Sequence, residues 1–235
     1  LVIGGRRDGH DWINAFADLQ DALDAARASP GVIHEIWVAT GIYRPDRGTG
    51  DRSKSYVMVD GVAVYGGFTA GATSLDQRSS TIESTILTGD IGVSGQSDDN
   101  SYHVVTCDSN ITSSTLIDGF LIKDGNANVA DGANQGGGIY MSGAGLHVHR
   151  CAFTDNHAVY GAALYVNGGL PMIRDCTFTS NSASQRGGGI YADGTDVPVV
   201  SCIFIRNNAV IGGGMCIYDG SPEIVNCQFL GQIAS

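Results

Sequence analysis

Arginine and aspartate occupy one equivalent position in two successive segments of the second half of the chain. Arg150 and Asp175 each come directly before a cysteine, and 25 residues separate them. If these segments stack as repeats, the two side chains lie on neighbouring coils. A carboxylate next to a guanidinium can act as a general acid or base, and it can equally be a surface ion pair of small energetic weight. These residues are therefore the candidate catalytic pair, with an ion pair as the alternative.

Three tyrosines also recur at one position of these segments: Tyr140, Tyr165 and Tyr191. Aromatic side chains present a large apolar face together with a polar tip. An outward-facing row of such rings is a candidate carbohydrate-binding surface, whereas inward-facing rings would fill the core. The sequence leaves both alternatives open.

Acidic residues in two regions are candidate ligands of Ca²⁺, which prefers oxygen donors. Asp124 and Asp131 belong to the first region, and Asp193 and Asp196 to the second. Neither pair has the spacing of a regular calcium-binding loop, so we expect no cofactor, with Ca²⁺ as the alternative. His147 and His149 are two residues apart on one predicted strand, so their side chains face the same side. They are candidates for a metal-binding or catalytic pair, with exposed polar residues as the alternative.

The cysteines fit a structural role better than a zinc site, because none of the six forms a Cys-x-x-Cys pair. Four of them share one position of the repeat and have apolar neighbours. We expect them to be buried free thiols that pack as small hydrophobic groups. These four are Cys151, Cys176, Cys202 and Cys227.

The element that positions these residues is a repeat of 25–26 residues. The Gly-Gly-Gly-Ile-Tyr segment at 136–140 has counterparts at 161–165, 187–191 and 212–216, with offsets of 25, 26 and 25. A phenylalanine follows two residues after each cysteine of the column, and an asparagine follows three residues after that. The two columns are Phe153, Phe178, Phe204 and Phe229, and Asn156, Asn181 and Asn207, with Gln232 in the fourth asparagine position.

This period predicts an all-β solenoid, a parallel β-helix. Apolar residues alternate over short spans, as in strands, and glycine triplets would break a helical repeat. We expect three short strands per coil, with equivalent side chains stacked from coil to coil. The asparagines are expected in left-handed turns, and the glycines at corners with positive φ or close backbone packing.

The first half of the chain is less regular but belongs to the same predicted domain, which spans 1–235. Residues 1–35 are expected to form an N-terminal cap, with a helix over about 14–28 that Asp11 or Asn14 caps. Residues 36–116 are predicted to form irregular early coils, and 117–235 regular ones. The chain ends within a coil, so we expect further chain or another subunit at that end.

Composition excludes several classes of partner. The net charge of −11 disfavours nucleic acid and anionic lipid, both of which require a basic surface. It permits divalent cations and neutral sugars. The sequence contains no apolar run of membrane-spanning length, so we expect no membrane span.

The chain resembles bacterial extracellular right-handed parallel β-helix proteins of the pectate-lyase-like superfamily. The resemblance rests on Leu-Gln-Asp-Ala-Leu at 19–23, Ile-Trp-Val-Ala at 36–39 and Tyr-Gly-Gly-Phe at 65–68. The Phe-x-x-Asn segments beside Gly-Gly-Gly-Ile are similar to repeats of polymorphic outer-membrane proteins. The resemblance implies a right-handed helix and an extracellular or cell-surface location, but no single reaction, because this fold carries many functions.

Three functions follow as hypotheses. The first is a non-enzymatic structural or adhesive protein of the cell surface that associates with itself through the ends of the β-helix into filaments. It rests on the regular repeats and on the lack of a convergent catalytic set. The second is a polysaccharide lyase or glycoside hydrolase of the same superfamily, and the third a carbohydrate-binding module. A polysaccharide is the expected partner in the last two.

Overall fold

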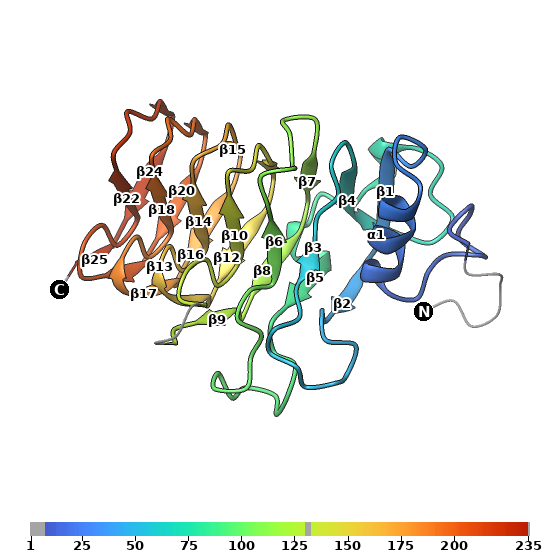
Figure 1. Ribbon diagram of the computed structural model, residues 1–235, viewed down its shortest axis with the longest axis horizontal. Helices are drawn as coiled ribbons and strands as arrows, with labels where there is room; N and C mark the ends of the chain where they lie inside the picture. The colour runs from blue at the N-terminus through green and yellow to red at the C-terminus, as the bar shows by residue number, and fades with distance from the viewer. Residues whose placement is uncertain (1–7, 130–132, 235) are drawn as a thin grey trace.

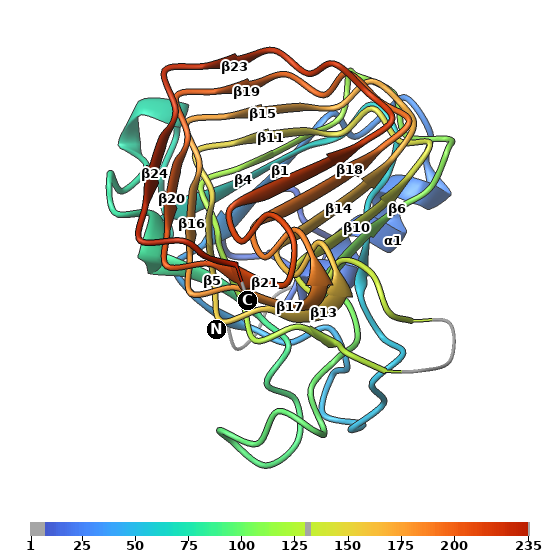
Figure 2. The same cartoon turned by 90° about the vertical axis from the view of Figure 1, so that its left-hand side faces the viewer.

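The structure, a computed structural model, describes residues 8–129 and 133–234. The chain winds into a right-handed parallel β-helix with one helix at its N-terminal end, as predicted (Figure 1). Viewed along the axis, successive coils lie one behind another and their strands line up in flat walls (Figure 2). Every pairing between described strands is parallel, and strands pair only with their counterparts in neighbouring coils.

Four parallel sheets form the walls, and we call them sheets A to D. Sheet A contains β1 (Glu35–Ala39), β4 (Ala63–Phe68), β7 (Leu116–Asp118), β11 (His147–His149), β15 (Met172–Arg174), β19 (Val199–Val200) and β23 (Ile224–Val225). Sheet B contains β2 (Gly41–Tyr43), β5 (Thr85–Thr88), β8 (Leu121–Lys123), β12 (Ala152–Thr154), β16 (Thr177–Thr179), β20 (Ile203–Ile205) and β24 (Gln228–Leu230).

Sheets C and D complete each coil. Sheet C contains β3 (Tyr56–Val57), β6 (Val105–Cys107), β10 (Ile139–Ser142), β14 (Leu164–Asn167), β18 (Ile190–Asp193) and β22 (Met215–Tyr218). Sheet D contains β9 (Asn126–Ala127), β13 (His157–Tyr160), β17 (Ser182–Arg186), β21 (Asn208–Ala209) and β25 (Ile233–Ala234). A regular coil therefore has four short strands instead of the predicted three, because the asparagine corner separates two strands that the sequence pattern merges.

A column of phenylalanine rings runs through the interior of the regular coils, beside aliphatic columns from sheets A and C. Phe153, Phe178 and Phe204 are fully buried and stack face to face, with ring centroids 5.0 and 4.7 Å apart. Full burial of such a side chain stabilises the fold by roughly 1.5–3 kcal/mol. Phe229 continues the stack at 4.5 Å but is 45% exposed in the last coil. The phenylalanine column is thus the shared core of the coils, as predicted.

The asparagine column forms a buried hydrogen-bond ladder at the corner between sheets B and D. The Oδ1 atom of Asn181 accepts from both the backbone N–H and the Nδ2 of Asn156, at 3.1 and 3.0 Å. Asn181 in turn donates through Nδ2 to Oδ1 of Asn207 at 2.9 Å. Mutual bonding of the side chains is confirmed, but their predicted left-handed conformation is wrong. The residue before each asparagine takes it instead, for example Asp155 with φ 54° and Ser180 with φ 55°.

The glycine triplets serve both purposes that the sequence suggested. The first residue of each, such as Gly136 with φ 65°, adopts a positive φ. The third lies against the next coil: a Cβ on Gly138 would come within 2.5 Å of the Ala163 carbonyl oxygen. At Gly138, close stacking on the next coil therefore depends on the missing side chain, whereas the equivalent position of that coil carries Ala163.

Among the described residues, the single α-helix is α1 (Leu19–Ala28), which packs Leu19, Leu23 and Ala26 into the core at the N-terminal end. Two short 3-10 helices, η1 (Leu75–Gln77) and η2 (Ile82–Ser84), follow β4. Helix α1 begins later than the predicted residue 14, because Asp18 caps it by accepting a hydrogen bond from the Gln20 N–H at 2.7 Å. Asp11 and Asn14 lie in a preceding turn. Within the described ranges, no helix combines the length and apolarity needed to cross a membrane.

Candidate functional site

Charged residues occupy one outward-facing row of sheet A. Strand register aligns Asp118 with His149 and His149 with Arg174 on three successive coils. Their neighbours Ile117 and Val148 are buried in the core, so alternation along each strand turns the charged side chains outward. The coil spacing of ~4.8 Å brings their heads within hydrogen-bonding reach.

A second column adds two side chains at the corner between sheets A and B. Arg150 and Asp175 occupy equivalent positions there, in left-handed conformations with φ 46° and 53°. Gly119 holds the same position one coil earlier, with φ 82°. The corner turns both side chains back toward the charged row of sheet A.

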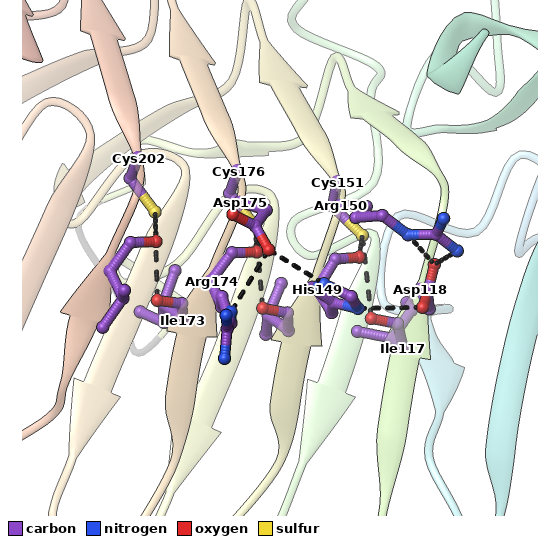
Figure 3. Close-up of polar contacts among 12 residues, drawn as sticks. Ile117, Asp118, His149, Arg150, Cys151, Ile173, Arg174, Asp175, Cys176 and Cys202 are labelled. Carbon is purple, nitrogen blue, oxygen red and sulfur yellow. Dashed lines mark hydrogen bonds and ion pairs between the residues drawn. The ribbon is translucent and has the colours of Figure 1, made fainter. Parts of the chain in front are cut away.

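The six residues Arg78, Asp118, His149, Arg150, Arg174 and Asp175 make one network, which we call the Asp118 cluster; Figure 3 shows all of them except Arg78. Arg150 donates from Nη2 to Asp118 Oδ1 at 2.7 Å, and Arg78 donates from Nη1 to the same oxygen at 3.0 Å. Asp118 exposes 4% of its side chain. Charge-assisted hydrogen bonds of this kind contribute about 1.5–3 kcal/mol each, so Asp118 anchors both guanidinium groups.

His149 links the two carboxylates of the cluster. Its Nδ1 lies 3.0 Å from Asp118 Oδ2, and its Nε2 lies 3.1 Å from Asp175 Oδ2. Both ring nitrogens can donate at once only in the imidazolium form. Arg174 also donates from Nε to Asp175 Oδ2, at 3.2 Å. The cluster thus holds groups that can transfer a proton beside groups that bind anions.

A small cavity of about 100 Å³ opens beside the two anchored arginines. Among the described residues, Arg78 and Arg150 are the charged side chains that line it, together with Ser79, Ser80 and backbone around Gly119. Arg78 additionally lies over the ring of Tyr65, 5.1 Å from its centroid. Guanidinium groups match carboxylate and sulfate oxygens in geometry, so the cavity can hold such a group.

The two predicted catalytic candidates thus lie in one network, but they do not pair directly. Arg150 pairs with Asp118, and Asp175 with His149 and Arg174. Sequence reasoning missed Asp118, although it precedes the corner glycine of the irregular coil by one residue. It also missed Arg78, which approaches from a loop after β4 with no repeat to align it. His147 lies one outward position before His149 on β11, outside this network.

The tyrosine row lies on the outer face of sheet C, with Tyr140 half-buried and the other two rings nearly covered. Tyr140, Tyr165 and Tyr191 stack on one another with centroids 5.5 Å apart and interplanar angles of 3° and 8°. The ring of Tyr160 lies against Tyr191 at 5.6 Å. Tyr165 and Tyr191 are each only 6% exposed, because neighbouring rings and side chains cover their faces.

The calcium candidates do not gather into a ligand set. Asp124 pairs with Lys123 at 3.2 Å, and Asp196 accepts from the Ser221 N–H. Asp193 lies on β18, and Asp131 lies outside the described residues. Over 8–129 and 133–234, no three His, Cys, Asp or Glu side chains are grouped to hold a metal ion. A calcium site therefore stays a prediction, and the described residues provide no group of ligands for it.

The cysteine column lies directly beneath the charged corner, with its thiols pointing to backbone carbonyl groups (Figure 3). Cys151 donates from Sγ to the His149 carbonyl at 3.3 Å, and Cys176 does the same to Arg174 at 3.2 Å. Both are buried and free, as predicted, whereas Cys227 in the last coil is half-buried. Burial raises the pKa of the Cys151 thiol to about 12, which keeps it protonated and unreactive at neutral pH.

Comparison with known proteins gives one match. Residues 99–233, more than half of the chain, match the family model described as a right-handed beta helix region. No curated protein and no solved structure matches the chain. The matched segment includes Asp118, His149, Arg150, Arg174 and Asp175.

Proposed function

We propose that this chain, which belongs to the right-handed β-helix family, is an extracellular or cell-surface protein that adheres to an acidic polysaccharide through the outer face of sheet A. One observation carries the proposal. In a protein of net charge −11, the cavity beside the Asp118 cluster is lined by two arginines and, among the described residues, by no acidic side chain. A carboxylate group of a uronic acid matches that lining.

The same outward row supports a chain-like ligand. Register aligns Trp37 with Tyr65 and Tyr65 with Asp118, so two half-buried aromatic rings precede the charged residues along the row. Trp37 is held in place by stacking on Phe68, with centroids 4.5 Å apart. A glycan lying along the axis would place sugar faces on the rings and carboxylates at the arginines.

The experiment compares two matched arginine variants. Arg150→Gly removes one guanidinium from a corner position with φ 46°, and Arg206→Gly does the same at an exposed corner position with φ 51°. Glycine accepts both conformations, so both variants are expected to fold. Affinity electrophoresis in polygalacturonate should show retardation of the wild type and of Arg206→Gly, and its loss in Arg150→Gly. Equal retardation of all three would reject the proposal.

A lyase is the second candidate, because His149 between two carboxylates provides proton-transfer groups beside the arginine-lined cavity. β-Elimination from a uronic acid needs a base for the proton next to the carboxylate, a cationic group that stabilises the developing charge, and an acid that protonates the glycosidic oxygen as its bond to carbon breaks. Ultraviolet absorbance of the unsaturated product measures this activity directly. Absorbance that rises with the wild type and not with His149→Gln would favour the lyase; binding without product would favour adhesion. Association of the β-helix ends into filaments stays a prediction, which analytical ultracentrifugation can test by measuring the mass of the particles in solution.

A further inference from the structure

The ring of His149 lies between two carboxylates, so its protonation state affects both of them (Figure 3). Its Nδ1 lies 3.0 Å from Asp118 Oδ2, and its Nε2 lies 3.1 Å from Asp175 Oδ2. Histidine is the side chain whose charge changes between about pH 5 and 8. Because only the imidazolium form can donate through both ring nitrogens, the two hydrogen bonds exist together only when His149 is protonated.

The charged groups of the Asp118 cluster face this ring from several elements of the described chain. One carboxylate comes from β7 and the other from the corner after β15, beside a guanidinium group at the end of β15. Two further guanidinium groups, from the corner after β11 and from the loop after β4, donate to the β7 carboxylate. In this order, the five residues are Asp118, Asp175, Arg174, Arg150 and Arg78. Three guanidinium groups and two carboxylates leave a charge of +1, which protonation of His149 raises to +2.

Loss of the proton opens the link to Asp175 and keeps the link to Asp118. Asp118 exposes 4% of its side chain and is held by two guanidinium groups, whereas Asp175 exposes 39%. A neutral imidazole has one N–H, which stays on the buried carboxylate, and it turns a lone pair toward the other carboxylate. Asp175 then loses one of its two cationic partners and presents a less compensated negative charge on the outer face of sheet A.

We propose that His149 makes binding of the acidic polysaccharide depend on pH: the imidazolium form holds the ligand, and the neutral form releases it. This inference rests on the proposed function, because it concerns the same ligand at the same cavity. The ring and the two guanidinium groups that line the cavity share the Asp118 carboxylate, so the ring lies within a Debye length of about 8 Å of the lining. One positive charge lost at that distance weakens the binding of an anion by about threefold or more.

Affinity electrophoresis of the full chain in polygalacturonate tests the inference at about pH 5.5 and about pH 8, where the carboxylates of the polymer stay ionised. A gel without the polymer at each pH corrects for the charge of the protein itself. His149→Gln removes the titrating ring. His147→Gln is the matched control, because it removes the other outward histidine of β11, which lies outside the cluster. Asp175→Asn removes the exposed carboxylate with a residue that tolerates φ 53°.

We expect the wild type and His147→Gln to bind at least about threefold more tightly at the lower pH. His149→Gln should bind equally at both pH values. Asp175→Asn should bind more tightly than the wild type at the higher pH, because no carboxylate is released there.

Equal retardation of the wild type at both pH values would overturn the inference and leave the proposed function standing. A pH dependence that survives in His149→Gln, or one that disappears in His147→Gln, would also overturn it. A wild type that is retarded at neither pH would reject the proposed function and the inference with it.

Discussion

Replacement of Asn181 by alanine tests whether the asparagine ladder holds the coils together. The side chain is fully buried and makes four hydrogen bonds. Its Oδ1 accepts from the backbone N–H and the Nδ2 of Asn156, and its Nδ2 donates to the Phe153 carbonyl and to Asn207 Oδ1. Alanine removes all four and leaves the backbone conformation unchanged.

The structure sets the magnitude, because most of the four partners keep another bond. Asn156 Nδ2 still donates to the Ile122 carbonyl at 3.0 Å, and Asn207 Oδ1 still accepts from the backbone N–H at position 181. The Asn156 N–H loses its partner in the interior, whereas the Phe153 carbonyl remains within the parallel pairing of β12 with β16. At about 1–3 kcal/mol for the buried orphan, plus the lost packing of the amide, we expect a loss of about 2–4 kcal/mol.

Asn167→Ala is the matched control, because this asparagine belongs to the adjoining coil and is exposed, with one contact to the Tyr165 hydroxyl at 3.4 Å. Urea unfolding followed by circular dichroism gives the free energy of unfolding for each variant. The control should change it by less than about 0.5 kcal/mol. A loss below about 1 kcal/mol for Asn181→Ala, or one equal to the control, would show that the ladder contributes little to stability.

Three further outcomes follow from burial and charge. Phe178→Ala should lower the free energy of unfolding by about 3–5 kcal/mol, whereas Phe229→Ala, whose ring is 45% exposed, should cost clearly less in the same urea experiment. Burial lowers the pKa of His103 below its ordinary 6.5, so the unfolded chain binds a proton that the native state does not. The free energy of unfolding should therefore fall as pH drops through and below 6.5. The thermal midpoint of His103→Gln should fall less over the same pH range. Ellman's reagent should modify the half-buried Cys216 readily in the native protein, while Cys151, with its pKa raised to about 12, should react only after urea is added; a fast reaction of all six thiols would contradict the burial of the column.

The regular coils were predictable because stacking makes each residue type repeat. Phe153 and Phe178 recur in register since an aromatic ring is stabilised by an identical ring one coil away, and Asn156 and Asn181 recur since each amide bonds the next. The extra strand of each coil was not predictable, because a single buried alanine such as Ala158 marks it. Such a short signal merges with the neighbouring strand.

The candidate site was only partly predictable, because its partners come from places that the repeat does not align. Arg150 and Asp175 follow from their shared column. Asp118 belongs to the irregular coil, and Arg78 reaches it from a loop 40 residues earlier in the chain. Contacts of this kind depend on loop geometry, which residue spacing does not encode.

The corner that carries Arg150 and Asp175 has nearly the same backbone on every regular coil, with φ 55° at Ser201 and 53° at Asn226. Side chains at this corner can therefore be exchanged between coils while the backbone stays as it is. A guanidinium and a carboxylate introduced at Ser201 and Asn226 would meet the same local geometry, two coils farther along the axis. The charge pattern of this corner is therefore set by the side chains placed there, and the backbone beneath would accept a different set of side chains without refolding.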